Sequence, residues 1–334
     1  MNEFFFTLFS LLTIFFINKF RVIISQKTNL IDKPNKVRKF HLKETPLLGG
    51  LMIYSTFIYI NFYLYFFSNY DNIAIVIFII SSCYFFIGLF DDNRGISYSY
   101  KLVISFILLY VALTLEPNLQ INKIYFISLN KYFDFGSYSI FFTIVCLMLL
   151  INSINLIDGI DGLCLLIIIT FFISTIIFFE NIILPYIMMI ITLLYVLLLN
   201  LKKKIFIGDS GSLFLGSLVG LLIINSYNNI ILTTNYPVEN IFIILMLPGI
   251  DMFRVFIQRF LKKKNPFTAD RAHLHYLLLD KPLKLNKVLI IFLTLVLIPI
   301  FVNLSTKIDS YLIILAFILA YIFLILYLYK VKNN

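Results

Sequence analysis

The sequence predicts an all-α polytopic membrane protein with about eleven transmembrane helices. Of its 334 residues, 61% are hydrophobic and 13% are charged, and the mean hydropathy is +0.97. The apolar residues form long runs, and at about 1.5 Å per residue a run of ~20 residues crosses a bilayer core of about 30 Å. Backbone groups in lipid must be hydrogen-bonded within each segment, so these runs are expected to be helices. The predicted spans are 2–24, 47–67, 73–90, 102–115, 139–154, 163–179, 183–201, 213–225, 239–260, 288–302 and 311–329.

The distribution of Lys and Arg predicts the orientation of these spans. If the first span runs from outside to inside, 24 of the 27 basic residues fall in cytoplasmic segments and only Lys123, Lys131 and Lys307 fall outside. Such an excess is typical of cytoplasmic loops. We therefore expect the N-terminus outside and the C-terminus in the cytoplasm. Lys19 and Arg21 follow the first apolar run, which favours a retained helix over a cleaved signal.

The remaining composition predicts one membrane domain, residues 1–334, without a separate soluble part. The net charge of +10 arises in the inner loops, where it faces anionic lipid, so no nucleic-acid partner is expected. Cys83, Cys146 and Cys164 lie in or beside apolar spans without metal-ligand spacing, so we interpret them as packing residues. The longest outer segment, 116–137, has room for a small hairpin.

Two acidic motifs follow odd-numbered spans on the predicted cytoplasmic face. Asp91 and Asp92 close the third span, where adjacent carboxylates repel each other and Mg²⁺ would relieve the repulsion. A solvated helix end explains this pair equally well. After the fifth span, Asn155, Asp158 and Asp161 are spaced three apart, so neighbouring members share a face on a helical turn. Two Asp-Gly steps then break the helix and let backbone approach a ligand, which favours a binding site over a plain loop.

Two glycine-containing segments lie on the same predicted face. Gly208 and Asp209 precede the eighth span and form a candidate site for an anion or a metal-bound phosphate at the start of a helix. A capped helix start would explain the same residues. In the first inner loop, Pro46 and a following glycine pair favour a turn that presents Lys43 and Thr45 at the membrane surface. A simple membrane-entry turn is the alternative.

One of the two long inner loops carries two of the three histidines. His273 and His275 would project together from an extended segment. No cysteine is near, so a zinc site is not expected, and Arg271 beside two imidazoles favours contact with a phosphate or a nucleotide. An interfacial basic loop is the alternative. Asp251 and Arg254, three apart in the ninth span, predict an ion pair within the membrane, either structural or catalytic.

Together these inner segments favour phosphoryl transfer. They supply carboxylates for Mg²⁺, cations for phosphates and glycines for close approach, and phosphoryl transfer is catalysed largely by positioning and by neutralising charge. A transporter of an anionic lipid or nucleotide is the alternative from another class. Transporters usually place ionisable groups near the bilayer midplane on broken helices, whereas most of these groups lie at the inner ends of spans.

Taken in order, the motifs resemble those of the polyprenyl-phosphate N-acetylhexosamine-1-phosphate transferases, glycosyltransferase family 4, which contains MraY, WecA and TagO. The resemblance runs from about Lys43 to Tyr276, and the histidine segment is similar to the WecA-like branch. Tyr276 stands where many WecA-like proteins have a further histidine. The matching segments are Lys43 with Thr45, Asp91 with Asp92, 155–163, 208–212 and 270–275.

The resemblance implies that a polyprenyl phosphate, undecaprenyl phosphate, attacks the β-phosphorus of a UDP-N-acetylhexosamine and releases UMP. It implies an enzyme of the bacterial inner membrane that initiates a cell-envelope glycan such as O-antigen or a cell-wall polymer. The implied cofactor is Mg²⁺, with Mn²⁺ as an alternative, and the implied assembly is a homodimer. The implied site comprises catalytic Asp91, Asp92, Asp158 and Asp161, substrate-binding Lys43, Thr45, Lys101, Asn155, Gly208, Arg271, His273 and His275, and the metal ligand Asp209.

Overall fold

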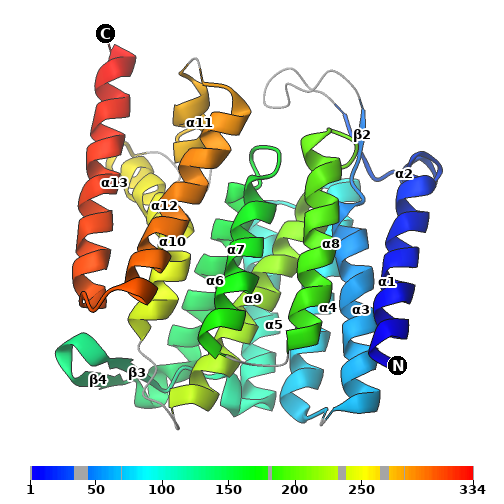
Figure 1. Cartoon of the computed structure of the whole chain (residues 1–334), viewed down its shortest axis with the longest axis horizontal. Helices are drawn as coiled ribbons and strands as arrows, with labels where there is room; N and C mark the ends of the chain where they lie inside the picture. The colour runs from blue at the N-terminus through cyan, green and yellow to red at the C-terminus, as the bar shows by residue number, and fades with distance from the viewer. Residues whose placement is uncertain are drawn as a thin grey trace. The chain divides into compact units, whose positions relative to one another are not determined.

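The computed structural model of the chain is predominantly helical (Figure 1). It describes residues 2–33, 44–68, 70–179, 183–231, 238–263, 271–281 and 283–333. The helices are α1 (Asn2–Lys19), α2 (Arg21–Thr28), α3 (Gly49–Phe67), α4 (Asn72–Arg94), α5 (Tyr98–Leu115), α6 (Ser139–Ile157), α7 (Leu163–Phe179), α8 (Ile183–Leu201), α9 (Gly208–Ile231), α10 (Val238–Leu261), α11 (Leu274–Leu279), α12 (Leu285–Ser305) and α13 (Ser310–Asn333). The short strands are β1 (Ile31–Asp32), β2 (Thr45–Pro46), β3 (Lys123–Phe126) and β4 (Lys131–Asp134).

Every predicted span overlaps a helix, which confirms the predicted fold class. Within the described residues, nine helices are long and apolar enough to cross a membrane, or ten if the bent pair α1–α2 is counted. The predicted number of eleven is therefore not confirmed. The first span bends by 73° at Phe20 instead of continuing to Ile24, and α7 qualifies only as a shorter apolar helix.

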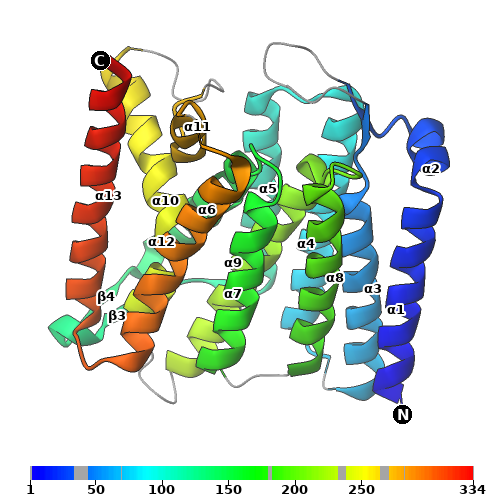
Figure 2. The same cartoon turned by 45° about the horizontal axis from the view of Figure 1, so that its top comes forward.

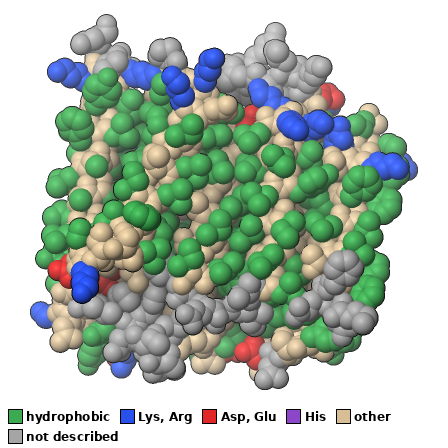
Figure 3. Space-filling model, viewed as in Figure 1, with side chains coloured by type: hydrophobic (Ala, Val, Ile, Leu, Met, Phe, Trp, Pro, Cys, Tyr) green, Lys and Arg blue, Asp and Glu red, His purple; other side chains and the backbone are tan. Residues whose placement is uncertain are grey.

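The exterior of the helices supports the same class. Apolar side chains cover the sides of the helices, while Lys and Arg gather at helix ends (Figure 3). Phe106 of α5, Leu194 of α8 and Leu319 of α13 are among the large exposed apolar side chains. An apolar surface of this extent suits contact with lipid, so the chain is a multi-pass membrane protein.

Contacts divide the chain into two compact units. The first comprises Met1–Gln120 and Thr143–Leu222, and the second comprises Ile121–Phe142 and Ile223–Asn334. The earlier expectation of a single membrane domain over residues 1–334 stays a prediction.

In the first unit, α3 packs between α1 and α8, and α8 packs against α7 (Figures 1 and 2). Hydroxyl groups join three of these helices, because Thr56 of α3 hydrogen-bonds to Ser10 of α1 at 3.0 Å and to Thr192 of α8 at 2.8 Å. Paired hydroxyls satisfy one another inside an apolar bundle. α9 packs closely against α6, since a Cβ on Gly216 would lie 2.9 Å from Ile151 Cα. Close packing of this kind fixes the position of the start of α9.

In the second unit, α10, α12 and α13 pack against one another, and α11 lies against α12 and α13. The strands β3 and β4 form an antiparallel hairpin with Lys123 opposite Asp134, which confirms the hairpin predicted for segment 116–137. Glu239 at the start of α10 accepts hydrogen bonds from the backbone N–H and the hydroxyl of Ser128. The hairpin is therefore attached to the first turn of α10.

Candidate active site

The two units hold different parts of the predicted site. Lys43 lies outside the described residues. The first unit contains Thr45, Asp91, Asp92, Lys101, Asn155, Asp158, Asp161, Gly208 and Asp209, and the second contains Arg271, His273 and His275.

Glycines bring two helices against the start of α9. A Cβ on Gly88 of α4 would lie within 3.0 Å of the Asp209 carbonyl oxygen and of Ser210 backbone atoms. A Cβ on Gly50 of α3 would lie equally close to Gly211. The backbone N–H of Gly50 also donates to the carbonyl of Ile207 at 3.1 Å. Only residues without side chains allow these approaches, which bring the ends of α3 and α4 to the first turn of α9.

Asp92 of α4 accepts the free N–H groups at the start of α9. Its Oδ1 accepts from the Asp209 N–H at 2.8 Å, and its Oδ2 accepts from the Ser210 N–H at 3.0 Å. Gly208 precedes them with a φ of +69°, and a Cβ there would collide with the Asp92 carboxylate. The first N–H groups of a helix lack partners within the helix, and a carboxylate stabilises them. The start of α9 is thus capped from another helix.

Lys101 of α5 lies between two carboxylates. Its Nζ donates to Asp209 Oδ2 at 2.6 Å and forms an ion pair with Asp91 Oδ2. The other Asp91 oxygen accepts from the Ile96 N–H. The lysine side chain is only 18% exposed. Its two ion pairs hold the ammonium group between α4 and α9.

Thr45 is buried and pairs with Asp32 in the short β1–β2 ladder. Phe206, just before α9, donates its N–H to the carbonyl of Pro46 at 2.9 Å. The segment that carries Thr45 is therefore attached to the loop that leads into α9.

The acidic motif after α6 adopts a turn. The helix ends at Ile157, so Asn155 is helical while Asp158 and Asp161 lie in the following turn. The helix breaks at the Asp-Gly steps, as predicted, and Gly162 has a φ of +83°. Because it ends before Asp158, the three residues do not share a helical face. Asn155 Oδ1 still reaches α9, where it accepts from the Ser212 hydroxyl at 2.6 Å.

Asp158 lies within the electrostatic field of the other carboxylates. The pKa of its carboxyl group is raised well above its usual value, first by burial and then by the negative charges of Asp209, Asp92 and Asp161. Like charges in a partly desolvated site disfavour the ionised form, and a bound cation would reverse that effect.

The donor chemistry of this cluster fits Mg²⁺. Within the described residues, no group of three His, Cys, Asp or Glu side chains forms a complete metal site. Mg²⁺ needs no such group, because it commonly binds one or two protein carboxylates together with water and substrate phosphates. Lys101 pairs with two of the four carboxylates here, and the mutual repulsion of these carboxylates is what a bound cation would relieve. Those carboxylates are Asp91, Asp92, Asp158 and Asp209.

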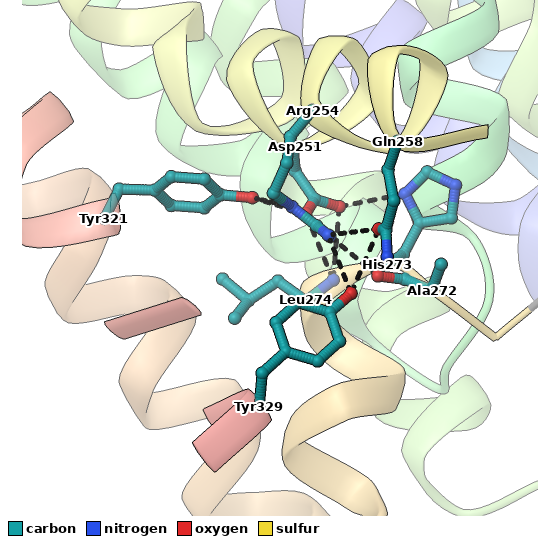
Figure 4. Close-up of polar contacts among 8 residues, drawn as sticks. All are labelled: Asp251, Arg254, Gln258, Ala272, His273, Leu274, Tyr321 and Tyr329. Atoms are coloured by element: carbon teal, nitrogen blue, oxygen red, sulfur yellow. Dashed lines mark hydrogen bonds and ion pairs between the residues drawn. The ribbon is translucent and has the colours of Figure 1, made fainter. Parts of the chain in front are cut away.

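A separate polar cluster surrounds Asp251 of α10 in the second unit (Figure 4). Arg254 Nη2 donates to Asp251 Oδ1 at 2.8 Å, which confirms the predicted ion pair. The Tyr321 hydroxyl donates to the same oxygen at 2.7 Å, and His273 Nδ1 lies 2.9 Å from Oδ2. The Leu274 N–H also donates to Oδ1, at 3.1 Å. Asp251 therefore connects α10 and α13 to the histidine segment.

The two histidine rings lie together, as predicted. Their centroids are 5.8 Å apart and their planes differ by 6°. The segment is extended only in part, because His273 has an extended backbone just before α11 whereas His275 lies in that helix. Both side chains are buried, and burial lowers the pKa of His275 to about 3, so this ring is neutral near pH 7. Arg271 forms an ion pair with Asp280 at 2.9 Å and lies over the ring of Tyr276.

Comparison with known proteins finds similar sequences. The family model described as "Glycosyl transferase family 4" matches residues 73–227. The match covers the central part of the chain. An undecaprenyl-phosphate alpha-N-acetylglucosaminyl 1-phosphate transferase of Escherichia coli (strain K12) is 29% identical over 298 residues, 81% of this chain and 74% of the relative. A protein of the same name from Thermotoga maritima is 25% identical over 281 residues, 83% of this chain and 82% of the relative.

The part of the chain that matches glycosyl transferase family 4 contains the whole carboxylate cluster. Residues 73–227 include α4, α5, the turn after α6 and the start of α9. The sequence pattern of the family therefore coincides with the elements that bring Lys101 between Asp91 and Asp209.

Asn200, also within the family match, was missed by sequence reasoning. It is 4% exposed, accepts from the Gly162 N–H, and donates to the Ile205 carbonyl at 3.0 Å. It thus ties the Asp-Gly turn to the segment that leads into α9. A single amide at the end of an apolar run, just before the three lysines 202–204, was the available signal.

Proposed function

We propose that this protein transfers N-acetylglucosamine 1-phosphate from UDP-N-acetylglucosamine to undecaprenyl phosphate. The products are UMP and an undecaprenyl-diphosphate-linked sugar. The observation that carries the proposal is the position of Lys101 between Asp91 and Asp209 at the start of α9, inside the part that matches glycosyl transferase family 4. The names of the relatives supply the acceptor lipid and the sugar phosphate.

The reaction needs little proton transfer. A phosphate monoester has a second pKa of about 6, so the acceptor phosphate is mostly dianionic near neutral pH. One of its oxygens bonds to the β-phosphorus of the donor. The bond from that phosphorus to the oxygen bridging to the α-phosphate breaks, and UMP leaves with the electron pair. No general base is required, so the carboxylates are free to position cations.

Each group of the cluster has a role in this proposal. The Lys101 ammonium stabilises negative charge on the phosphoryl oxygens, and Asp91 and Asp209 orient it. Asp92 positions Asp209, because its carboxylate accepts hydrogen bonds from the backbone N–H groups at the start of α9. Asp209 is the proposed ligand of Mg²⁺, with Mn²⁺ as a substitute. When bound, the ion would neutralise charge on the donor diphosphate.

The remaining predicted residues complete the proposed substrate sites. Asn155, Asp158, Asp161 and Gly208 line the diphosphate region, and Lys43 with Thr45 serves the acceptor phosphate. Arg271, His273 and His275 bind the nucleotide sugar. These assignments rest on the family resemblance and on the placement of the described residues at helix ends.

The proposed setting is the plasma membrane of a bacterium, with the N-terminus outside and the site on the cytoplasmic face. The 24 to 3 division of basic residues supports this orientation. The cluster also argues against the transporter alternative. Asp92 lies in the last turn of α4 and Asp209 in the first turn of α9, at helix ends and not near the middle of a span.

Replacing Lys101 tests the role of the ammonium group. Lys101→Met is expected to lower kcat for UMP formation by about 10²-fold, because a charge that stabilises the phosphoryl oxygens is lost. Lys123→Met is the matched control, since Lys123 is 57% exposed and pairs with Asp134 in the hairpin at 3.4 Å. Equal rates in the two variants would contradict the assignment.

The proposal as a whole is tested by UMP release from purified protein. The assay supplies undecaprenyl phosphate, Mg²⁺ and, in turn, UDP-N-acetylglucosamine, UDP-N-acetylgalactosamine and UDP-glucose, with EDTA as the metal control. We expect UMP with UDP-N-acetylglucosamine that depends on both lipid and metal. Folded protein that binds undecaprenyl phosphate and releases no UMP from any donor would contradict it.

A further inference from the structure

The Asp251 carboxylate is bound more completely than an ion pair requires. Its side chain is 4% exposed, and its Oδ1 accepts from Arg254 Nη2, the Tyr321 hydroxyl and the Leu274 N–H. Its Oδ2 faces His273 Nδ1 at 2.9 Å (Figure 4). The donors come from α10, α13 and the start of α11, so the carboxylate is fixed in one orientation.

Arg254 already balances the charge of Asp251. It also donates through Nη2 to the Ala272 carbonyl at 2.7 Å and through Nε to the Tyr321 hydroxyl at 2.8 Å. Asp251 therefore needs a hydrogen bond donated by His273 but no second positive charge. A neutral imidazole has one N–H and one acceptor nitrogen, and the partner of one nitrogen decides the state of the other. With Nδ1 donating to Asp251, Nε2 becomes the acceptor.

The Nε2 atom of His273 is buried and has no hydrogen-bond partner within the described part of the chain. Figure 4 shows this second ring nitrogen directed away from Asp251. A buried acceptor without a partner costs free energy, so its presence beside a fully bonded cluster indicates a ligand that supplies the donor. Both ring nitrogens of His275, which is fully buried next to it, are also without partners among the described residues.

We propose that Asp251 is the positioning residue of His273. It holds the imidazole as the Nδ1–H tautomer, so that Nε2 accepts a hydrogen bond from an O–H or N–H group of the nucleotide sugar. The identity of that ligand rests on the proposed function. The sequence alone favoured contact with a phosphate or a nucleotide for this segment. An acceptor nitrogen faces a phosphate oxygen unfavourably, so a donor group of the nucleotide sugar suits it better. Tyr321 supports the same geometry through its bond to Asp251 Oδ1.

The tautomer can be measured directly, because the chain has only three histidines. The protein is labelled with ring-¹⁵N histidine in detergent, and the His273 signals are assigned from the spectrum of His273→Gln. At pH 7 we expect a protonated Nδ1 and an unprotonated Nε2. An Nε2–H tautomer or a doubly protonated ring in the unsubstituted protein would overturn the proposal without reference to activity.

Asp251→Asn is the decisive variant. Three donors converge on the Oδ1 position, so the amide oxygen takes that place and the NH₂ group faces His273. An NH₂ group donates, so His273 Nδ1 must accept and the proton moves to Nε2. We expect the NMR tautomer to switch and KM for UDP-N-acetylglucosamine to rise by about 10- to 100-fold, the range found for groups that orient metal-ligating histidines. The change should lie in KM more than in kcat, and the Mg²⁺ dependence should be unchanged.

Tyr329→Phe is the matched control for Tyr321→Phe, since both residues lie on α13 and the Tyr329 hydroxyl donates to Gln258 at 3.0 Å without touching Asp251. Tyr321→Phe is expected to raise KM, and Tyr329→Phe to leave it unchanged. A folded Asp251→Asn protein with an unchanged tautomer and KM would overturn the proposal. If the unsubstituted protein released no UMP, the proposed function would fail while the tautomer measurement would still decide the role of Asp251.

Discussion

Asp209→Asn is expected to lower the rate of UMP formation by about 10³-fold, at the upper end of the cost of losing one electrostatic contact in an active site. The substitution removes the charge that pairs with Lys101 at 2.6 Å and that would bind Mg²⁺. It keeps the contact to Asp92, because that contact is made by the backbone N–H of residue 209. The protein should therefore remain folded, as checked by size-exclusion chromatography and thermal unfolding in detergent.

The matched control for this substitution is Asp134→Asn. Asp134 lies in the β3–β4 hairpin, is 49% exposed, and pairs with Lys123 at 3.4 Å. An exposed pair of this kind contributes little, so turnover should be unchanged. Full activity in Asp209→Asn, measured over a range of Mg²⁺ concentrations, would rule out the metal assignment.

Gly88→Ala is expected to lower turnover by about 10²-fold, the effect of a displacement near 1 Å in a site that depends on positioning. The new Cβ would lie within 3.0 Å of the Asp209 carbonyl oxygen and of Ser210 backbone atoms, so the start of α9 must move. Overpacking at such a contact costs about 1–3 kcal/mol of stability. Kinetics and thermal unfolding of the purified variant measure the two effects.

Gly249→Ala provides the comparison for Gly88→Ala. Gly249 lies inside α10, and a Cβ there would meet nothing within 4 Å. Alanine also favours a helix more than glycine does, so stability should be equal or slightly higher. If Gly88→Ala behaved like Gly249→Ala, the close contact between α4 and α9 would not control the site.

Much of this structure follows from local sequence patterns. The apolar runs determine the helices, because backbone N–H and C=O groups in lipid can form hydrogen bonds only within their own segment. The hairpin at 123–134 and the Asp251–Arg254 pair also depend on short separations in the chain. These features could be predicted from residues that are neighbours in sequence or on one face of a helix.

The contacts that form the candidate site could not be predicted in the same way. Lys101 and Asp209 are 108 residues apart, and Asp92 reaches a helix that begins more than a hundred residues later. Their pairing depends on how α4, α5 and α9 pack. Tyr321, 70 residues from Asp251, stands in a helix whose other tyrosines look similar in sequence. Such pairings are decided by tertiary packing and not by a local pattern.

The central claim is that a phosphoryl group moves with the sugar, and the fate of the β-phosphorus tests it most directly. Purified protein is given undecaprenyl phosphate, Mg²⁺ and UDP-N-acetylglucosamine labelled with ³²P at the β-position, and lipid is then extracted into organic solvent. Phosphosugar transfer predicts that the label enters the lipid fraction in an amount equal to the UMP formed. Label that stays in water as UDP while the sugar enters the lipid would mean simple glycosyl transfer and would contradict the claim.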